Sequence, residues 1–252
     1  MDEHVLLICT LFEGLPRQGP GSDACTRKMF RMLPALPENP EILDIGCGSG
    51  MQTLELARLC NTCRITAVDV YPPFLAALRE NAEREGLNRR IRTISASMDD
   101  LPFDDEMFDL IWAEGSIFIM GPENALPSWN RYLRPGGFLA FTDAVWLTDT
   151  PSPEVAAFWE RVNPDIRTAA EMRSVAEKAG YSVLADFVLP ASVWWDQYYI
   201  PLEARLEGLY KRYHGNPEAI GMIDMIGEEI ALFREHPDEY GYVFFLLQKG
   251  SE

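Results

Sequence analysis

The sequence is poor in histidine and in basic residues, and each shortage excludes a class of protein. Its 252 residues include 3 histidines, and 22 lysines and arginines stand against 39 aspartates and glutamates, a formal net charge of −17. A surface of that sign repels nucleic-acid phosphates and anionic lipid, so we expect neither nucleic acid nor a membrane as a partner. A small or cationic ligand suits this charge better.

Cysteine is also scarce, and its pattern argues against a disulfide framework or a metal centre. The 5 cysteines are an odd number, and only Cys60 and Cys63 form a C-x-x-C pair. One such pair cannot complete a tetrahedral zinc site, and the histidines show no ligand spacing. We therefore predict reduced thiols and no metal.

Long apolar runs are absent as well. The most apolar window near the start is VLLICTLF, residues 5–12, which is shorter than a membrane span and follows acidic residues. A signal peptide would carry basic residues there and a longer apolar stretch. We therefore expect a cytoplasmic protein. The 47% of apolar residues suffices for the core of one α/β domain.

Strand-like and helix-like segments alternate through residue 146, a pattern typical of a parallel sheet wrapped by helices. Expected strands are 41–46, 64–70, 91–97, 108–115 and 138–146, and expected helices are 51–60, 72–86 and 123–133. After Trp146 we expect helices at 153–162, 168–180 and 201–236, the last broken at HGNP, and late strands at 181–190 and 240–249.

A glycine turn lies inside EILDIGCGSGMQTLELA, residues 41–57, between an apolar strand and a helix. It lacks the lysine of a triphosphate-binding GxxxxGK[ST] loop. It also lacks the third glycine of the dinucleotide motif GxGxxG, since Met51 takes that place. Asp44, just before the first glycine, would repel a pyrophosphate and attract a cation. S-adenosylmethionine, which carries an ammonium and a sulfonium, meets these requirements.

A second carboxylate, Asp69, ends the next apolar run, ITAVD. Neighbouring parallel strands would bring Asp44 and Asp69 to the edge of the sheet where such folds bind ligands. An acidic side chain there can accept hydrogen bonds from both ribose hydroxyls. An unpaired carboxylate under a glycine turn also needs a partner, so we predict that both contact the cofactor.

Five ordered motifs, LDIGCGSG, AVDV, SMDDLPF, FDLIWAEGSIF and LRPGGFLAFTDAVW, resemble the class I S-adenosylmethionine-dependent methyltransferases. The likeness covers residues 40–147 best and is nearest to the small-molecule branch related to ubiquinone and menaquinone biosynthesis. It implies a Rossmann-like, mostly parallel sheet of seven strands whose antiparallel last strand lies next to the fifth. We expect one domain with a cofactor-binding core (27–147), helical cap elements within 148–236, and a last strand (240–249).

The resemblance also implies a set of cofactor-binding residues: Asp44, Gly46, Cys47, Gly48, Asp69, Val70, Ser97, Met98, Asp99 and Glu114. The first glycines would lie along the methionine part, and Ser97, Met98 and Asp99 would border the adenine. Many relatives have an Asp-Ala pair where this chain has Ser97-Met98, so Asp99 is the alternative acceptor for the exocyclic amine. Glu114 would face the methyl group or the substrate, and it is the first candidate for a catalytic base.

The substrate is less readable, because methyl transfer mainly requires a positioned nucleophile and the exclusion of water. The aromatic segment SVWWDQYYIPLE offers Trp195, Tyr198 and Tyr199 as walls of an acceptor pocket, together with Trp146. Packing of the cap onto the sheet would explain these aromatics equally well, and it explains Trp194 better. The glycine- and proline-rich segment 15–26 is either a plain loop or a cover whose Arg17 or Gln18 reaches the cofactor.

We therefore predict a methyltransferase that uses S-adenosylmethionine and a small-molecule acceptor. The alternatives are an NAD-dependent oxidoreductase on a similar sheet, a cofactor-binding protein without methyl-transfer activity, and a methyltransferase acting on a basic protein tail. A homodimer is compatible with the sequence.

Overall fold

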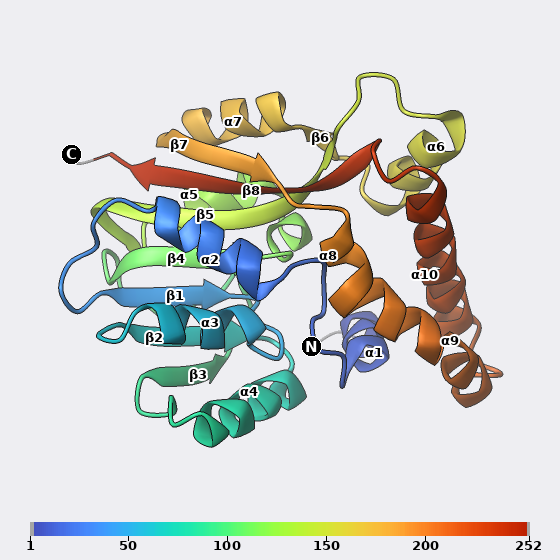
Figure 1. Ribbon diagram of the computed structural model, residues 1–252, viewed down its shortest axis with the longest axis horizontal. Helices are drawn as coiled ribbons and strands as arrows, with labels where there is room; N and C mark the ends of the chain where they lie inside the picture. The colour runs from blue at the N-terminus through green and yellow to red at the C-terminus, as the bar shows by residue number, and fades with distance from the viewer. Residues whose placement is uncertain (1–2, 251–252) are drawn as a thin grey trace.

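One mixed sheet organises the chain (Figure 1). The computed structural model describes residues 3–250. The strands are β1 (Glu41–Ile45), β2 (Arg64–Asp69), β3 (Ile91–Ser95), β4 (Phe108–Glu114), β5 (Leu133–Trp146), β6 (Arg167–Thr168), β7 (Tyr181–Val188) and β8 (Tyr240–Lys249). The helices are α1 (Glu3–Phe12), α2 (Asp23–Met32), α3 (Met51–Leu59), α4 (Pro72–Arg84), η1 (Ile117–Ile119), α5 (Pro122–Asn130), α6 (Pro153–Val162), α7 (Ala169–Lys178), α8 (Ser192–Trp194), η2 (Trp195–Tyr199), α9 (Ile200–Arg212) and α10 (Pro217–Glu235).

The strand order is β3-β2-β1-β4-β5-β8-β7, and the short strand β6 pairs with β5. Strands β1 to β5 pair in parallel, whereas β8 is antiparallel to both β5 and β7. The expected fold class is confirmed, including the antiparallel last strand beside the fifth. The two-residue strand β6 is an addition that the sequence pattern did not indicate.

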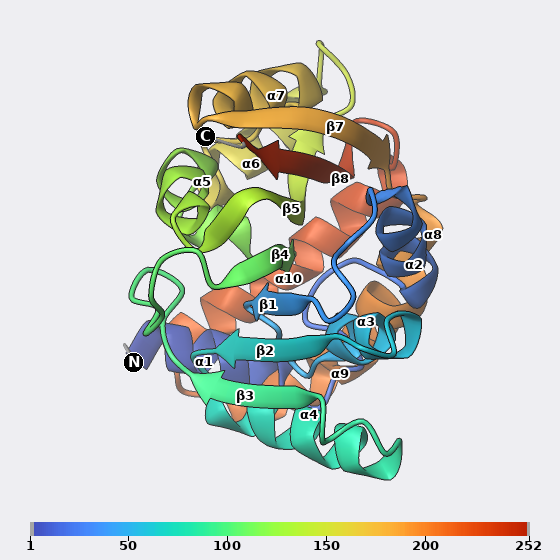
Figure 2. The same ribbon diagram turned by 90° about the vertical axis from the view of Figure 1, so that its left-hand side faces the viewer.

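Helices cover both faces of the sheet. Helices α2 and α3 lie on one face, and α5 and α7 lie on the other (Figure 2). Two large apolar clusters follow from this layering, one around Trp112 and Phe244 and the other around Trp129 and Phe141. Near-complete burial of both faces explains why β4, β5 and β8 read as continuous apolar runs.

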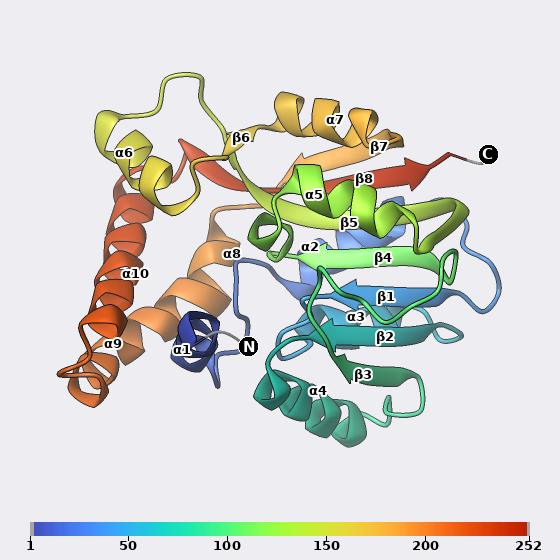
Figure 3. The same ribbon diagram turned by 180° about the vertical axis from the view of Figure 1, so that it is seen from behind.

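The cap helices α8, η2, α9 and α10 lie beyond the carboxyl edge of the parallel strands (Figures 1 and 3). Helices α9 and α10 are separated at residues 213–216, as HGNP predicts, and the Asn216 side chain accepts a hydrogen bond from the Ala219 N–H to begin α10. Helix α1 lies between this cap and the sheet (Figure 3). None of the helices within residues 3–250 combines the length and apolarity that crossing a bilayer requires.

The N-terminal segment and strand β5 differ from the sequence expectations. Helix α1 was not expected at all, and α2 begins at Asp23 because the Ser22 side chain caps it, so the loop before it is shorter than 15–26. Strand β5 begins at Leu133 and not at residue 138. Its RPGG segment lies within the strand and shifts the pairing register with β4. Leu133 pairs with Phe108, and the next pair is Phe138 with Leu110.

Candidate cofactor and acceptor site

The glycine turn between β1 and α3 depends on its glycines for two different reasons. Gly46, Gly48 and Gly50 have φ values of 68°, 53° and 82°, a region that favours glycine. A Cβ at Gly46 would lie 2.5 Å from the Cβ of Ser116, and one at Gly50 would lie 2.2 Å from Cδ1 of Leu78. Gly50 therefore serves the packing of α3 on α4, whereas Gly46 and Gly48 shape the turn itself.

Asp69 lies at the tip of β2, directly beside this turn. Its Oδ2 accepts a hydrogen bond from the Gly48 N–H at 2.8 Å, and its Oδ1 accepts one from the Tyr71 N–H at 2.9 Å. Burial raises the pKa of Asp69, and these backbone donors oppose that shift. Each carboxylate oxygen keeps a further lone pair, so the side chain can still accept hydrogen bonds from a ligand.

Asp44 is fully buried and points into α3. Its Oδ2 accepts a hydrogen bond from the Thr53 hydroxyl at 2.5 Å, and its Oδ1 accepts one from the Gln52 amide at 3.4 Å. The expectation that this carboxylate lacks a protein partner is therefore wrong, because helix α3 supplies two. Burial raises the pKa of Asp44 to about 7, so a cation bound above the turn would favour its ionised form.

The other residues expected around the cofactor lie on both sides of the turn. Ser97 and Asp99 are exposed after β3, and Met98 is half-buried with its methyl 3.5 Å from where a Gly46 Cβ would lie. The side chain of Cys47 is buried in an apolar cluster, so only its backbone faces the turn. Val70 follows Asp69 directly and is half-buried.

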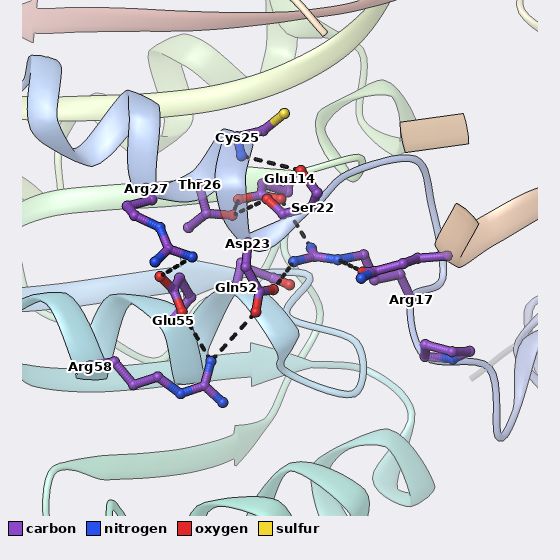
Figure 4. A network of polar contacts seen from close by, with 12 residues as sticks. Arg17, Ser22, Asp23, Cys25, Thr26, Arg27, Gln52, Glu55, Arg58 and Glu114 are labelled. Atoms are coloured by element: carbon purple, nitrogen blue, oxygen red, sulfur yellow. Dashed lines mark hydrogen bonds and ion pairs between the residues drawn. The ribbon is translucent and has the colours of Figure 1, made fainter. Parts of the chain in front are cut away.

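Glu114 ends β4 and has only 5% of its side chain exposed. Its Oε1 accepts hydrogen bonds from the Thr26 hydroxyl at 2.6 Å and the Trp112 indole at 2.9 Å, and its Oε2 lies 3.3 Å from Nη1 of Arg17 (Figure 4). Burial raises the pKa of Glu114, while the charge of Arg17 opposes that shift.

Residues 13–22, here termed the N-terminal lid, fold over the site. Arg17 is almost wholly buried and also donates hydrogen bonds to Asp23 at 2.7 Å and to Gln197 of the cap at 3.0 Å. Figure 4 shows its guanidinium between Asp23 and Glu114. One lid residue thus joins α2, the end of β4 and the cap.

The lid also touches the glycine turn. Gln18 Oε1 accepts a hydrogen bond from the Ser49 N–H at 2.7 Å, and the Ser49 hydroxyl donates to the Pro16 carbonyl at 3.1 Å. A Cβ at Gly48 would lie 2.4 Å from Gln18 Oε1. The Gln18 side chain therefore occupies the space through which a ligand would approach the turn.

The aromatic segment forms a π-helical turn, η2, inside the cap. Tyr198 and Tyr199 are buried and Trp195 is half-buried. Trp194 packs against Phe233 at 4.6 Å between ring centroids, which agrees with the expectation that it is a packing residue. Acceptor contact by the other three aromatics stays a prediction.

Trp146 is half-buried at the end of β5, where it pairs with Tyr240 of β8. It contributes to the apolar cluster that also contains the cap aromatics. Its contact with an acceptor stays a prediction.

Sequence reasoning missed two hydroxyl groups that hold the site carboxylates. Thr26 and Thr53 are fully buried on the inner faces of α2 and α3, where they donate to Glu114 and Asp44. A polar residue at an otherwise apolar helix position is the signal that would have found them.

Comparison with known proteins agrees with this geometry. Residues 43–141 match the family described as methyltransferase domain. The chain is 30% identical, over 149 residues, to the sarcosine/dimethylglycine N-methyltransferase of Halorhodospira halochloris, a match that covers 57% of this chain and 53% of that protein. The chain thus spans about half the length of that curated relative.

Two further matches cover nearly the whole chain. The 27-O-demethylrifamycin SV methyltransferase of Amycolatopsis mediterranei is 28% identical over 235 residues, 90% of this chain and 84% of that protein. A structure of an S-adenosylmethionine-dependent methyltransferase from Geobacter sulfurreducens, in complex with S-adenosyl-L-homocysteine, superposes with a TM-score of 0.80 at 20% identity, covering 96% of this chain and 97% of that one.

None of these matches points to the ubiquinone and menaquinone branch, so that finer assignment stays a prediction. The ordered motifs, the strand order and the match at residues 43–141 agree with one another. Residues 43–141 therefore match the family described as methyltransferase domain, and the fold of the chain is similar to that of an S-adenosylmethionine-dependent methyltransferase.

Proposed function

We propose that the protein transfers a methyl group from S-adenosylmethionine to a small-molecule acceptor. The observation that carries this proposal is the position of Asp69, whose carboxylate lies at the tip of β2 and hydrogen-bonds the backbone of the glycine turn at Gly48. A ribose placed there would meet an acceptor group that is already oriented by two backbone N–H donors.

The residues of the turn fit this cofactor. Because Gly46 and Gly48 lack a Cβ, a ligand can approach the main chain closely once the Gln18 side chain moves away. The buried negative charge of Asp44 lies behind the turn and attracts a cationic ligand. When bound, S-adenosylmethionine supplies an electrophilic methyl group on a good leaving group.

The lid and the residues at the strand ends would then exclude water and position the reactants. The lid excludes water from the reacting atoms and holds the site closed through Arg17. We assign the adenine border to Ser97, Met98 and Asp99, and we keep Trp146, Trp195, Tyr198 and Tyr199 as candidate acceptor contacts. Glu114 becomes available as a base only after its bond to Arg17 is broken.

Calorimetric titration with S-adenosylmethionine, S-adenosylhomocysteine and NAD tests the cofactor directly. We expect the first two to bind with 1:1 stoichiometry and NAD to show no heat. Binding of NAD alone would instead support the oxidoreductase alternative. Tight binding of S-adenosylmethionine with no methyl uptake by any acceptor in a metabolite screen would support the cofactor-binding alternative.

We also propose a cytoplasmic protein that does not bind nucleic acid. None of the five cysteines, all within the described residues, forms a disulfide, and the net charge of −17 opposes binding to phosphate backbones. Size-exclusion chromatography with light scattering tests the homodimer, and a shift assay with a mixed RNA pool tests the absence of nucleic-acid binding.

A further inference from the structure

An acidic side chain without a cationic partner lies in the cap. Glu229 of α10 accepts a hydrogen bond from the Tyr199 hydroxyl, with 2.6 Å between the oxygens, and within residues 3–250 this neutral hydroxyl is its only hydrogen-bonding partner. The adjacent residue Glu228 instead points outward and pairs with Arg161 at 2.6 Å. The two neighbouring carboxylates thus differ in whether a cation meets them.

Aromatic rings pack around Tyr199, the residue that donates to this carboxylate. Tyr199 packs against Tyr198, Trp194 and Trp195, with ring centroids 5.1, 5.5 and 5.4 Å apart. The hydroxyl of Tyr240 is buried in the same cluster and has no hydrogen-bond partner. The π-helical turn η2 brings Tyr198 and Tyr199 to this place, and π-helical turns are frequent at functional sites.

These features together suit a cation. A carboxylate that is partly withdrawn from water is costly unless a positive charge or several donors meet it, and the half-buried Glu229 has one donor. Burial raises the pKa of Glu229 to about 7, so near neutral pH the group is ready to ionise when a cation arrives. Aromatic faces carry negative electrostatic potential and attract ammonium groups within about 6 Å of the ring centroid.

The cluster is also continuous with the end of β4. Tyr242 packs on Trp194 at 4.9 Å, and its hydroxyl lies 3.6 Å from where a Cβ of Gly115 would stand, next to Glu114. Gln197 of the same π-helical turn accepts the hydrogen bond from Arg17. The cap cluster therefore adjoins the end of β4, where we expect the methyl group to be transferred.

We propose that Glu229 and the aromatic rings of η2 bind a positively charged ammonium group of the acceptor. That the bound molecule is the methyl acceptor rests on the proposed function. The cation site itself is defined by the carboxylate of Glu229 and the aromatic rings. The proposal commits the substrate class to molecules that carry a cationic amine, and not to phenols, sugars or carboxylic acids that lack one. A quaternary nitrogen has no lone pair, so in such a molecule the ammonium serves for binding and another nucleophilic atom takes the methyl group.

The test compares a cation with its neutral isostere. Choline and 3,3-dimethyl-1-butanol have the same shape and differ in the charge, and each is titrated by calorimetry into the protein saturated with S-adenosylhomocysteine. We expect choline to bind at least about tenfold more tightly than the alcohol. Equal affinities, or no detectable binding of choline, would overturn the proposal.

Two variants and a matched control locate the effect. Glu229→Gln should remove the preference for choline, whereas Glu228→Gln, which makes the same charge change one residue away, should keep it. Trp195→Leu, which removes a half-buried ring, should weaken choline binding and gives a second test should Glu229→Gln fold poorly. A preference retained in both Glu229→Gln and Trp195→Leu would place any cation site elsewhere and overturn the proposal.

The same titrations separate this inference from the proposed function. If wild-type protein binds S-adenosylhomocysteine but shows no preference for choline, the function stands and the inference fails. If it shows a Glu229-dependent preference for choline but does not bind S-adenosylhomocysteine, the cation site stands and the methyltransferase function fails.

Discussion

The guanidinium of Arg17 and the carboxylate of Glu114 lie 3.3 Å apart, although 97 positions separate them in the chain. Both side chains are 5% exposed, so water screens their attraction little. This contact ties the N-terminal lid to the end of β4, where we expect the methyl group. It makes opening of the lid a condition for freeing Glu114.

Replacing Arg17 tests this latch. Arg17→Gln should let the lid open more often, because it removes the charge that holds Glu114 and Asp23. We expect S-adenosylhomocysteine to associate about tenfold faster, as measured by stopped-flow tryptophan fluorescence. Arg27→Gln is the control, since the Arg27 side chain is 42% exposed and pairs with Glu55 outside the lid. Equal association rates in wild type and Arg17→Gln would contradict the latch.

Replacing Asp69 tests the ribose contact. Asp69→Ala should weaken the binding of S-adenosylmethionine by about 1–3 kcal/mol, since a charge-assisted acceptor is lost. Calorimetry measures the effect, and thermal unfolding shows whether the turn remains folded. Asp105→Ala removes an exposed carboxylate paired with Arg131 and should leave the affinity unchanged. Unchanged affinity in Asp69→Ala would refute the assignment.

Replacing Gly50 separates a steric clash from backbone strain. Gly50→Ala should lower the free energy of unfolding by about 2–4 kcal/mol, because its Cβ would lie 2.2 Å from the fully buried Leu78. Gly86→Ala has a similar φ, 70° against 82°, but its Cβ would meet no atom within 4 Å. It should cost only about 1 kcal/mol in the same urea denaturation. Equal losses would mean that α4 yields to the added methyl group.

The buried carboxyl of Asp143 predicts a pH dependence of stability. Burial raises its pKa from 3.8 to about 7, and within residues 3–250 the Ala144 N–H is its one hydrogen-bond donor. A folded-state pKa above the unfolded one means that the contribution of Asp143 is favourable below about pH 4 and is lost as pH rises through 7. Asp143→Asn should therefore gain about 1–3 kcal/mol over wild type at pH 8 and little at pH 4.

Urea denaturation at both pH values measures this difference. Burial raises the pKa values of Asp44 and Glu229 to about 7 as well. The wild-type protein and the Asp143→Asn variant should therefore both lose stability as the pH rises. The informative quantity is the difference between variant and wild type. Asp105→Asn, at an exposed site, should show no such difference. A gain of equal size at both pH values would show that Asp143 does not titrate in this range.

Local sequence patterns were sufficient to predict the strands of the sheet and the glycine turn. The apolar runs predicted β1 to β4 within one or two residues, and the family resemblance implied an antiparallel last strand next to β5. Asp69 was placed at the sheet edge correctly because parallel strands in register bring their carboxyl ends together. These features depend on neighbours in sequence or on the regular spacing of a sheet.

Contacts between distant segments were decided only by the tertiary structure. The sequence around Asp44 does not predict that Thr53 and Gln52 donate hydrogen bonds to its carboxylate, because these bonds depend on how α3 is rotated against β1. The bonds from Arg17 to Glu114 and from Tyr199 to Glu229 likewise join elements whose approach is set by packing. The sequence alone determined the sheet, the turn and the ligand class that suits them. The folded chain decided which carboxylates are already satisfied by protein donors, because burial and pairing arise only when distant surfaces meet.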